Sequence, residues 1–185
     1  GMLMALLGSL AGGPNRMLHF ERRVPWEGSM APLHDAMAKP ENWPRWFHGL
    51  AHVSRTRTGT LKAGETVELA IDPKKGDWKK FTIMARVTRI GTASEPRLEL
   101  DVSGDSKGKL QKVFSQIHWE VTAEGRDVVG RASALTQSWR SRLFSRMSER
   151  IVMNQIFYPD VMRLARNPLN PPESPQGISL SPSGM

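Results

Sequence analysis

The sequence contains no cysteine, a single tyrosine, and no apolar run long enough to cross a bilayer. Without cysteine the chain can form neither a disulfide framework nor a thiolate metal site. Its most apolar stretch, MLMALLGSLAGG at positions 2–13, lacks the basic start of a secretory signal. It also falls far short of the ~20 residues of a transmembrane helix. The default expectation is therefore a cytoplasmic location.

Several catalytic and nucleotide-binding signatures are missing as well. The sequence has no GxGxxG or GxxxxGK[ST] loop that would hold phosphate groups. It has no GxSxG turn that would expose a nucleophilic serine. His48 and His52 are four residues apart, but Gly49 lies between them and the next carboxylate is Glu65. We therefore predict no catalytic residue, no metal ligand and no cofactor.

The chain of 185 residues is the size of one domain and can bury about 70% of its unfolded surface. Its formal net charge of +8 raises nucleic acid, anionic membranes and acidic ligands as partners. Arg142, Arg146 and Arg150 would form a basic ridge on a helix, which is most often a solvated face. The six tryptophans are scattered through different segments, which favours roles in the core or in a pocket over nucleic-acid binding.

Alternating apolar residues predict about seven strands. The first covers Arg16–Val24, and Ser29 is a plausible N-cap for a short helix that ends before Pro40. A second short, tryptophan-rich helical turn follows at Glu41–His48. The remaining strands are expected at Leu50–Thr58, Val67–Ile71, Phe81–Val87, Leu98–Val102, Val113–Val121 and Val128–Ser138.

The segment Ser141–Arg166 has the period of a long amphipathic helix. Asn154 lies inside the apolar sector, where its amide needs a strand, a buried water or a ligand as hydrogen-bond partner. Pro159 lacks a backbone donor, so a kink, or a break with restart near Tyr158, is expected. The apolar stripe consists of Leu143, Phe144, Met147, Ile151, Tyr158, Val161, Met162 and Ala165.

The two ends of the chain differ in composition from the middle. Gly1 is interpreted as a residue left by tag removal, with Met2 as the native start. Residues 1–15 form an apolar extension that we expect to pack on the back of the long helix, to contact an anionic membrane peripherally, or to form the seam of a homodimer. Residues 167–185 are rich in Pro and Ser and are expected to be a flexible or extended tail.

The segment FERRVPWEGSMAPLHDAMAKPENWPRW and the final helix carry a resemblance to a known family. Together with the order strand, two short helices, six strands and long helix, they resemble the START-like helix-grip superfamily, which includes pollen allergens and polyketide cyclases or dehydratases. The resemblance covers Met17 to Arg166, so residues 16–166 are expected to form the domain. It implies an α+β fold in which a curved antiparallel sheet wraps the C-terminal helix around a cavity for lipids, polyketides or other hydrophobic ligands. It implies no reaction.

Alternation along the strands predicts which residues face this cavity. His19 and His118 are expected to point away from it. Arg22 and Arg55 are charged exceptions on the inward side; either they pair with an acidic ligand or, as we favour, they reach solvent near strand ends. The predicted walls are Val67, Leu69, Phe81, Ile83, Leu98, Leu100, Ile117 and Trp119 from the sheet, Met147, Ile151 and Asn154 from the long helix, and Trp43, Trp46 and Phe47 near the mouth.

We interpret the chain as a noncatalytic domain that binds a hydrophobic or amphipathic small molecule in such a cavity. One alternative is an enzyme of the cyclase or dehydratase kind, which requires an ionisable side chain in the cavity beside a polar partner. Another is a protein that binds a membrane surface or a partner through the arginine ridge and the apolar N-terminus.

Overall fold

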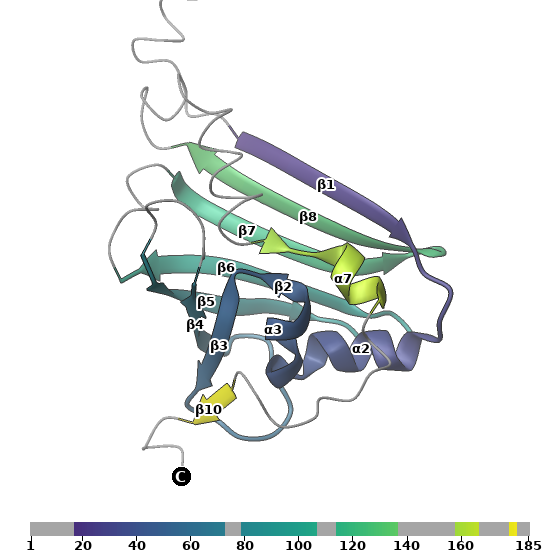
Figure 1. The fold of residues 1–185 in the computed structure, drawn as a ribbon, viewed down its shortest axis with the longest axis horizontal. Helices are drawn as coiled ribbons and strands as arrows, with labels where there is room; N and C mark the ends of the chain where they lie inside the picture. Colours follow the sequence, from purple (N-terminus) through teal and green to yellow (C-terminus); the bar gives the residue numbers. More distant parts are fainter. Residues whose placement is uncertain (1–16, 73–78, 107–113, 137–157, 167–177, 181–185) are drawn as a thin grey trace, which may run out of the picture.

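The computed structural model of the chain describes residues 17–72, 79–106, 114–136, 158–166 and 178–180. Within these ranges, seven antiparallel strands form one sheet in the order β1-β8-β7-β6-β5-β4-β3 (Figure 1). The predicted α+β class, with about seven strands and short helices after the first, is confirmed. The strands are β1 Met17–Pro25, β3 Leu50–Arg55, β4 Thr66–Ile71, β5 Phe81–Ile90, β6 Arg97–Asp105, β7 Phe114–Glu124 and β8 Asp127–Thr136.

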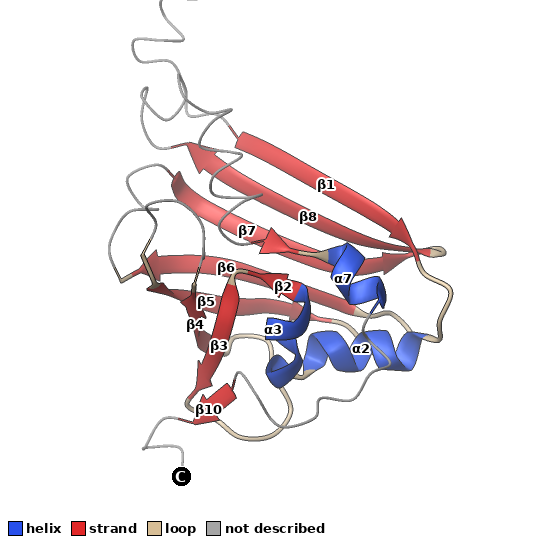
Figure 2. Ribbon diagram, viewed as in Figure 1, coloured by secondary structure: helices blue, strands red, loops and turns tan. Residues whose placement is uncertain are grey.

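The helices lie against one face of this sheet (Figure 2). A two-stranded ladder, β2 with β9, links the segment after α3 to the segment before α7. The short strand β10 adds to the edge of the large sheet by pairing in parallel with β3. The bounds of these elements are α2 Met30–Ala38, the 3₁₀ helix η1 Pro40–Asn42, α3 Trp43–Trp46, β2 Phe47–His48, β9 Tyr158–Pro159, α7 Val161–Arg166 and β10 Ile178–Leu180.

The sheet register places the predicted apolar residues on the face that carries the helices, which we call the inner face. Phe20 pairs with Ala132, Ala132 with Trp119, and Trp119 with Leu100, in a row across β1, β8, β7 and β6. Cross-strand partners point to the same side of a sheet. The strand residues predicted as cavity walls are all buried: Val67, Leu69, Phe81, Ile83, Leu98, Leu100, Ile117 and Trp119.

The tryptophan-rich segment, residues 43–47, contacts both α2 and this face of the sheet. The indole N–H of Trp43 donates to the carbonyl of Met37 at 2.8 Å, and that of Trp46 donates to the carbonyl of Ala36 at 3.0 Å. These bonds satisfy the polar end of each buried ring, as burial requires. Phe47 then meets Trp119 of β7 edge to face, with centroids 5.2 Å apart. The segment therefore joins α2 to the centre of the sheet.

The structure describes the end of the predicted long helix from Tyr158 onward. There β9 pairs with β2, and helix α7 starts only at Val161, which agrees with the interruption expected at Pro159. A continuous helix through Tyr158 and Pro159 is wrong, because proline supplies no backbone donor. The restart also shifts the buried side: Leu164 is buried while Met162 is 44% exposed, which contradicts the predicted stripe at Met162.

Some predictions lie outside the described residues. They concern the apolar extension 1–15, the arginine ridge, and the helix residues Met147, Ile151 and Asn154. In the segment predicted to be a flexible or extended tail, Ile178–Leu180 is extended and pairs with β3. Among the helices that the structure describes, none is both long and apolar enough to span a membrane.

Candidate functional site

A pocket of about 170 Å³ lies where β9 approaches β1 and β8. An enclosed apolar space of about 150 Å³ is enough for benzene, whereas pockets for drug-sized ligands are about 300–1,000 Å³. The pocket therefore has room for a group the size of one ring. Its lining residues are Phe20, Glu21, Arg22, Gly130, Arg131, Ala132, Tyr158 and Pro159.

Gly130 shapes this pocket by having no side chain. It is the Cα partner of Arg22 across β1 and β8. A Cβ at position 130 would lie 2.8 Å from Cγ1 of Val161, on α7, which is closer than carbon atoms pack. The glycine therefore lets α7 and β9 approach the sheet closely beside Arg22.

Tyr158 forms the wall that faces the sheet. Its ring stacks on His48, its partner in the β2–β9 ladder, with centroids 4.7 Å apart. The guanidinium carbon of Arg22 lies 5.5 Å from the centre of the same ring, within the range of a cation–π contact. Burial raises the pKa of the Tyr158 hydroxyl, and the charge of Asp160 adds to this, while Arg22 and Arg163 oppose it. The hydroxyl therefore stays protonated and is a hydrogen-bond donor.

Asp160 holds this wall in place. Its backbone N–H donates to the carbonyl of Trp46 at 3.1 Å. Its carboxylate accepts from the backbone N–H groups of Met162 and Arg163 at 3.1 and 3.2 Å, which caps α7. The position of Tyr158 is thus fixed from both sides, by the β2 ladder before it and by the capped helix after it.

The two inward arginines predicted from alternation have different surroundings. Arg55 is buried: its guanidinium donates to both carboxylate oxygens of Glu65, at 2.8 and 3.1 Å, and to the carbonyl of Gly59 at 3.0 Å. The expectation that Arg55 reaches solvent is therefore wrong, because Glu65 supplies the partner that burial demands. Arg22 is exposed and lines the pocket.

Of the predicted cavity walls that the structure describes, none lines this pocket. Those on the sheet are buried beside one another on the inner face, and Trp43, Trp46 and Phe47 are packed in the core. Their contact with a ligand stays a prediction. The sequence did not predict Gly130 and Tyr158 as pocket residues. Gly130 has no side chain, and Tyr158 was assigned to the long helix. The alternation that placed Arg22 inward was the signal in the sequence that pointed to this pocket.

No family model matches the sequence, and no curated protein matches it. Solved structures do match, at low identity. The ginseng major latex-like protein 151 from Panax ginseng has a TM-score of 0.57 at 10% identity, covering 81% of this chain and 93% of that one. Ara h 8.0201 has a TM-score of 0.54 at 11% identity, covering 84% and 100%. Norcoclaurine synthase from Thalictrum flavum has a TM-score of 0.52 at 7% identity, covering 76% and 79%.

The chain has the START-like helix-grip fold. At these identities the likeness concerns the fold alone, and it confirms the fold that the sequence resemblance implied. The pocket of the helix-grip domain lies on the inner face, the side on which the resemblance predicts the cavity.

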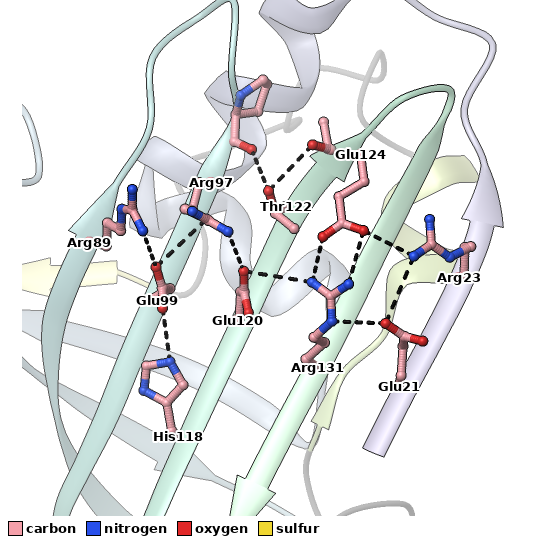
Figure 3. A network of polar contacts seen from close by, with 12 residues as sticks. Glu21, Arg23, Arg89, Arg97, Glu99, His118, Glu120, Thr122, Glu124 and Arg131 are labelled. Carbon is pink, nitrogen blue, oxygen red and sulfur yellow. Dashed lines mark hydrogen bonds and ion pairs between the residues drawn. The ribbon is translucent and has the colours of Figure 1, made fainter. Parts of the chain in front are cut away.

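The outer face of the helix-grip domain carries a network of paired charges (Figure 3). Arg131 is its centre: it donates to Glu21 at 2.8 Å and to both oxygens of Glu124 at 2.6 and 2.9 Å. The bonds from Arg131, and then from Arg23, lower the pKa of Glu124 to about 2. Arg97 continues the network by donating to Glu120 at 2.6 Å. The network joins strands β1, β8, β7 and β6 on the solvent side.

His118 extends this network, and it points away from the inner face as predicted. Its two ring nitrogens meet the carboxylates of Asp101 and Glu99, the latter at 3.1 Å. Burial works against protonation of the ring, but the two carboxylates outweigh it and raise the pKa of His118. A second hollow adjoins these groups and includes His19, Glu120 and Arg131. Arg131 and Glu120 are already bound within the network, so we interpret this hollow as part of the polar surface.

Proposed function

We propose that the helix-grip domain binds a hydrophobic or amphipathic small molecule on the inner face of its sheet, to carry it or to sense it. The observation that carries this proposal is the pocket beside β1 and β8. It combines an apolar floor, made by Phe20 and Ala132, with the cation of Arg22 and the hydroxyl of Tyr158. Ligand sites typically combine apolar walls with a few placed polar groups.

The energetics fit a ligand whose buried part is small. Apolar burial contributes about 25 cal/mol per Å², and a ring-sized group buries only part of a larger molecule. The remainder of such a ligand would extend from the pocket along the domain. A structure of similar fold, norcoclaurine synthase, is in complex with dopamine and hydroxybenzaldehyde. Small aromatic molecules are thus compatible with this architecture.

The enzyme alternative requires an ionisable group in the pocket, and Tyr158 is one. Tyr158 supplies an acid, however, and cyclisation or dehydration also needs a base. The carboxylate that borders the pocket, Glu21, is bonded to Arg131 at 2.8 Å. Arg22 is a permanent cation and cannot accept a proton. These contacts favour binding over acid–base catalysis among the described residues.

The test is to purify the protein without denaturation, extract it with organic solvent, and identify co-purifying small molecules by mass spectrometry. Thermal shifts with fatty acids, sterols and aromatic polyketides extend the search. A stoichiometric ligand in the extract, or a saturable shift, is the expected result. An empty extract together with no shift from any compound would overturn the proposal.

A blocking variant ties binding to this pocket. In Ala132→Leu the added carbon atoms enter the pocket and should prevent ligand binding. Ser133→Leu is the matched control, because residue 133 points to the outer face. Overpacking typically costs about 1–3 kcal/mol, so both variants are first compared by circular dichroism and thermal melting.

A further inference from the structure

Among the described strand residues of the inner face, Arg55 is neutralised by a carboxylate and Arg22 is not. The guanidinium of Arg55 is bound on two sides by the carboxylate of Glu65. Arg22 has the Tyr158 ring as its contact, and within the described ranges no carboxylate forms an ion pair with it. Arg22 is thus an exposed cation at the wall of a pocket that also has apolar groups, and a negatively charged group of a ligand can pair with it.

The charges around the pocket add to the same effect. Among the described lining residues, Arg22 and Arg131 are positive and Glu21 is negative, so their sum is 2 − 1 = +1. The Glu21 carboxylate is bonded to Arg131 on the outer face and does not compensate Arg22. The carboxylate of Asp160, behind Tyr158, caps α7. The local field at Arg22 therefore favours a negative group.

The second polar group of the pocket is also suited to an anion. Tyr158 is protonated at neutral pH, so its hydroxyl can donate a hydrogen bond but bears no repelling charge. No hydrogen bond from this hydroxyl to another described residue is present. A guanidinium can bind a carboxylate through two parallel hydrogen bonds, and a phenol donor beside it completes a site for such a group.

We propose that this pocket binds a carboxylate carried on a small aromatic or apolar group. Arg22 holds the carboxylate, Tyr158 donates to it, and Phe20 and Ala132 contact the apolar part. The pocket volume of about 170 Å³ sets the size of that part at about one ring. The proposal rests on the proposed ligand-binding function and names the class of ligand.

The experiment compares three molecules that share a phenyl ring and differ in charge: benzoate, benzamide and benzylammonium. Binding to the full chain is measured by titration of amide chemical shifts in NMR spectra. Charge-assisted hydrogen bonds are about twice as strong as neutral ones, so benzoate should bind at least about tenfold more tightly than benzamide. Benzylammonium should not bind measurably.

Two variants assign the preference to one side chain. Arg22→Gln should remove the preference, so that benzoate binds no more tightly than benzamide. The matched control is Arg23→Gln, which removes the neighbouring cation of the same strand on the outer face, where Arg23 pairs with Glu124 and Asp127. It should retain the preference for benzoate. Melting curves establish that both variants fold.

The outcomes separate this inference from the proposed function. Equal binding of benzoate and benzamide, or a preference that survives Arg22→Gln, overturns the inference while ligand binding itself stands. Absence of binding by all three probes also overturns it, since a ring-sized carboxylate is then not accepted. The extraction and thermal-shift tests decide the proposed function independently.

Discussion

Arg22 and Gly130 are Cα partners in neighbouring strands, so the arginine of the pocket faces a residue that has no side chain. The same glycine lies under Val161, the first residue of α7, where an added Cβ would approach Cγ1 to 2.8 Å. Residue 130 therefore controls how closely α7 docks on the sheet beside Arg22.

Replacing Gly130 by alanine should destabilise the domain. The new methyl group meets Val161, which is fully buried and cannot move away without displacing α7. Overpacking of this kind costs about 1–3 kcal/mol. The measurement is the free energy of unfolding in urea for Gly130→Ala against the unchanged chain.

Val161→Ala supplies the matched control for that change. Alone it creates a cavity and destabilises the domain. Combined with Gly130→Ala, it makes room for the new methyl group, so the double variant should be more stable than the sum of the two single effects implies. Strict additivity would contradict the proposed contact between residue 130 and α7.

The buried pair of Arg55 and Glu65 should respond differently from a surface pair. Their side chains are 5% and 2% exposed, so Glu65→Gln leaves a guanidinium without its counter-charge. Breaking such a pair costs about 3–5 kcal/mol. The exposed pair of Lys39 and Asp35, at 3.7 Å, is the control, and Asp35→Asn should change stability by no more than about 1 kcal/mol.

The double variant Arg55→Met with Glu65→Leu tests whether the loss of stability in Glu65→Gln comes from the unpaired charge or from a change in side-chain volume. Two apolar residues of similar volume remove both buried charges, and such replacements are often neutral or stabilising. We expect the double variant to be more stable than Glu65→Gln. If all these variants melted like the unchanged chain, the pair would not be a buried ion pair in solution.

The sheet could be predicted from the sequence because its rule is local. Residues such as Leu100 and Trp119 alternate with polar neighbours, and a period of two indicates a strand with one buried face. The same rule placed Arg22 inward and His118 outward. It could not identify Glu65 as the partner of Arg55, because Glu65 precedes its strand and its orientation depends on the loop between β3 and β4.

The pocket could not be predicted, because its causes are tertiary. Gly130 is important because it has no side chain where Val161 of α7 packs, and Val161 is 31 positions away in the sequence (161 − 130). Tyr158 fits a helical period, and only its pairing with His48 makes it a strand residue and a pocket wall. Likewise, the contact of His118 with Asp101 depends on the register between β6 and β7, which alternation leaves open.

The stability of the domain should depend on pH through His118. Its folded-state pKa is raised above the ordinary value by Asp101 and Glu99, which outweigh burial. A raised pKa means that the folded state binds the proton of His118 more tightly than the unfolded state does. The contribution is therefore complete below the ordinary histidine pKa of about 6.5 and is lost as pH rises through the folded-state value.

Urea unfolding of the unchanged chain and of His118→Gln, at several pH values from about 5 to 9, measures this contribution. The difference in unfolding free energy between the two proteins should shrink as pH rises. NMR titration of the imidazole should show a lower pKa in Asp101→Asn, which removes one of the two carboxylates. A difference that stays constant with pH would contradict the assignment.

Tyr158 is the only tyrosine in the chain, so the phenolate absorbance in the near ultraviolet reports its ionisation alone. The pKa of this hydroxyl should lie above its ordinary value of about 10. Burial is the main cause, the charge of Asp160 adds to it, and Arg22 opposes it. A spectrophotometric titration of the folded chain, with circular dichroism at each pH to verify folding, measures the midpoint.

Two variants should shift that midpoint in opposite directions. Asp160→Asn removes a negative charge, and the pKa of Tyr158 should fall. Arg22→Gln removes the nearby cation, and the pKa should rise. Asparagine can still cap α7, so Asp160→Asn changes the charge without releasing the helix. Arg23→Gln, on the outer face, should leave the midpoint in place. If Arg22→Gln did not move it, Arg22 would not lie over the Tyr158 ring, and the anion site built from these two residues would lose its basis.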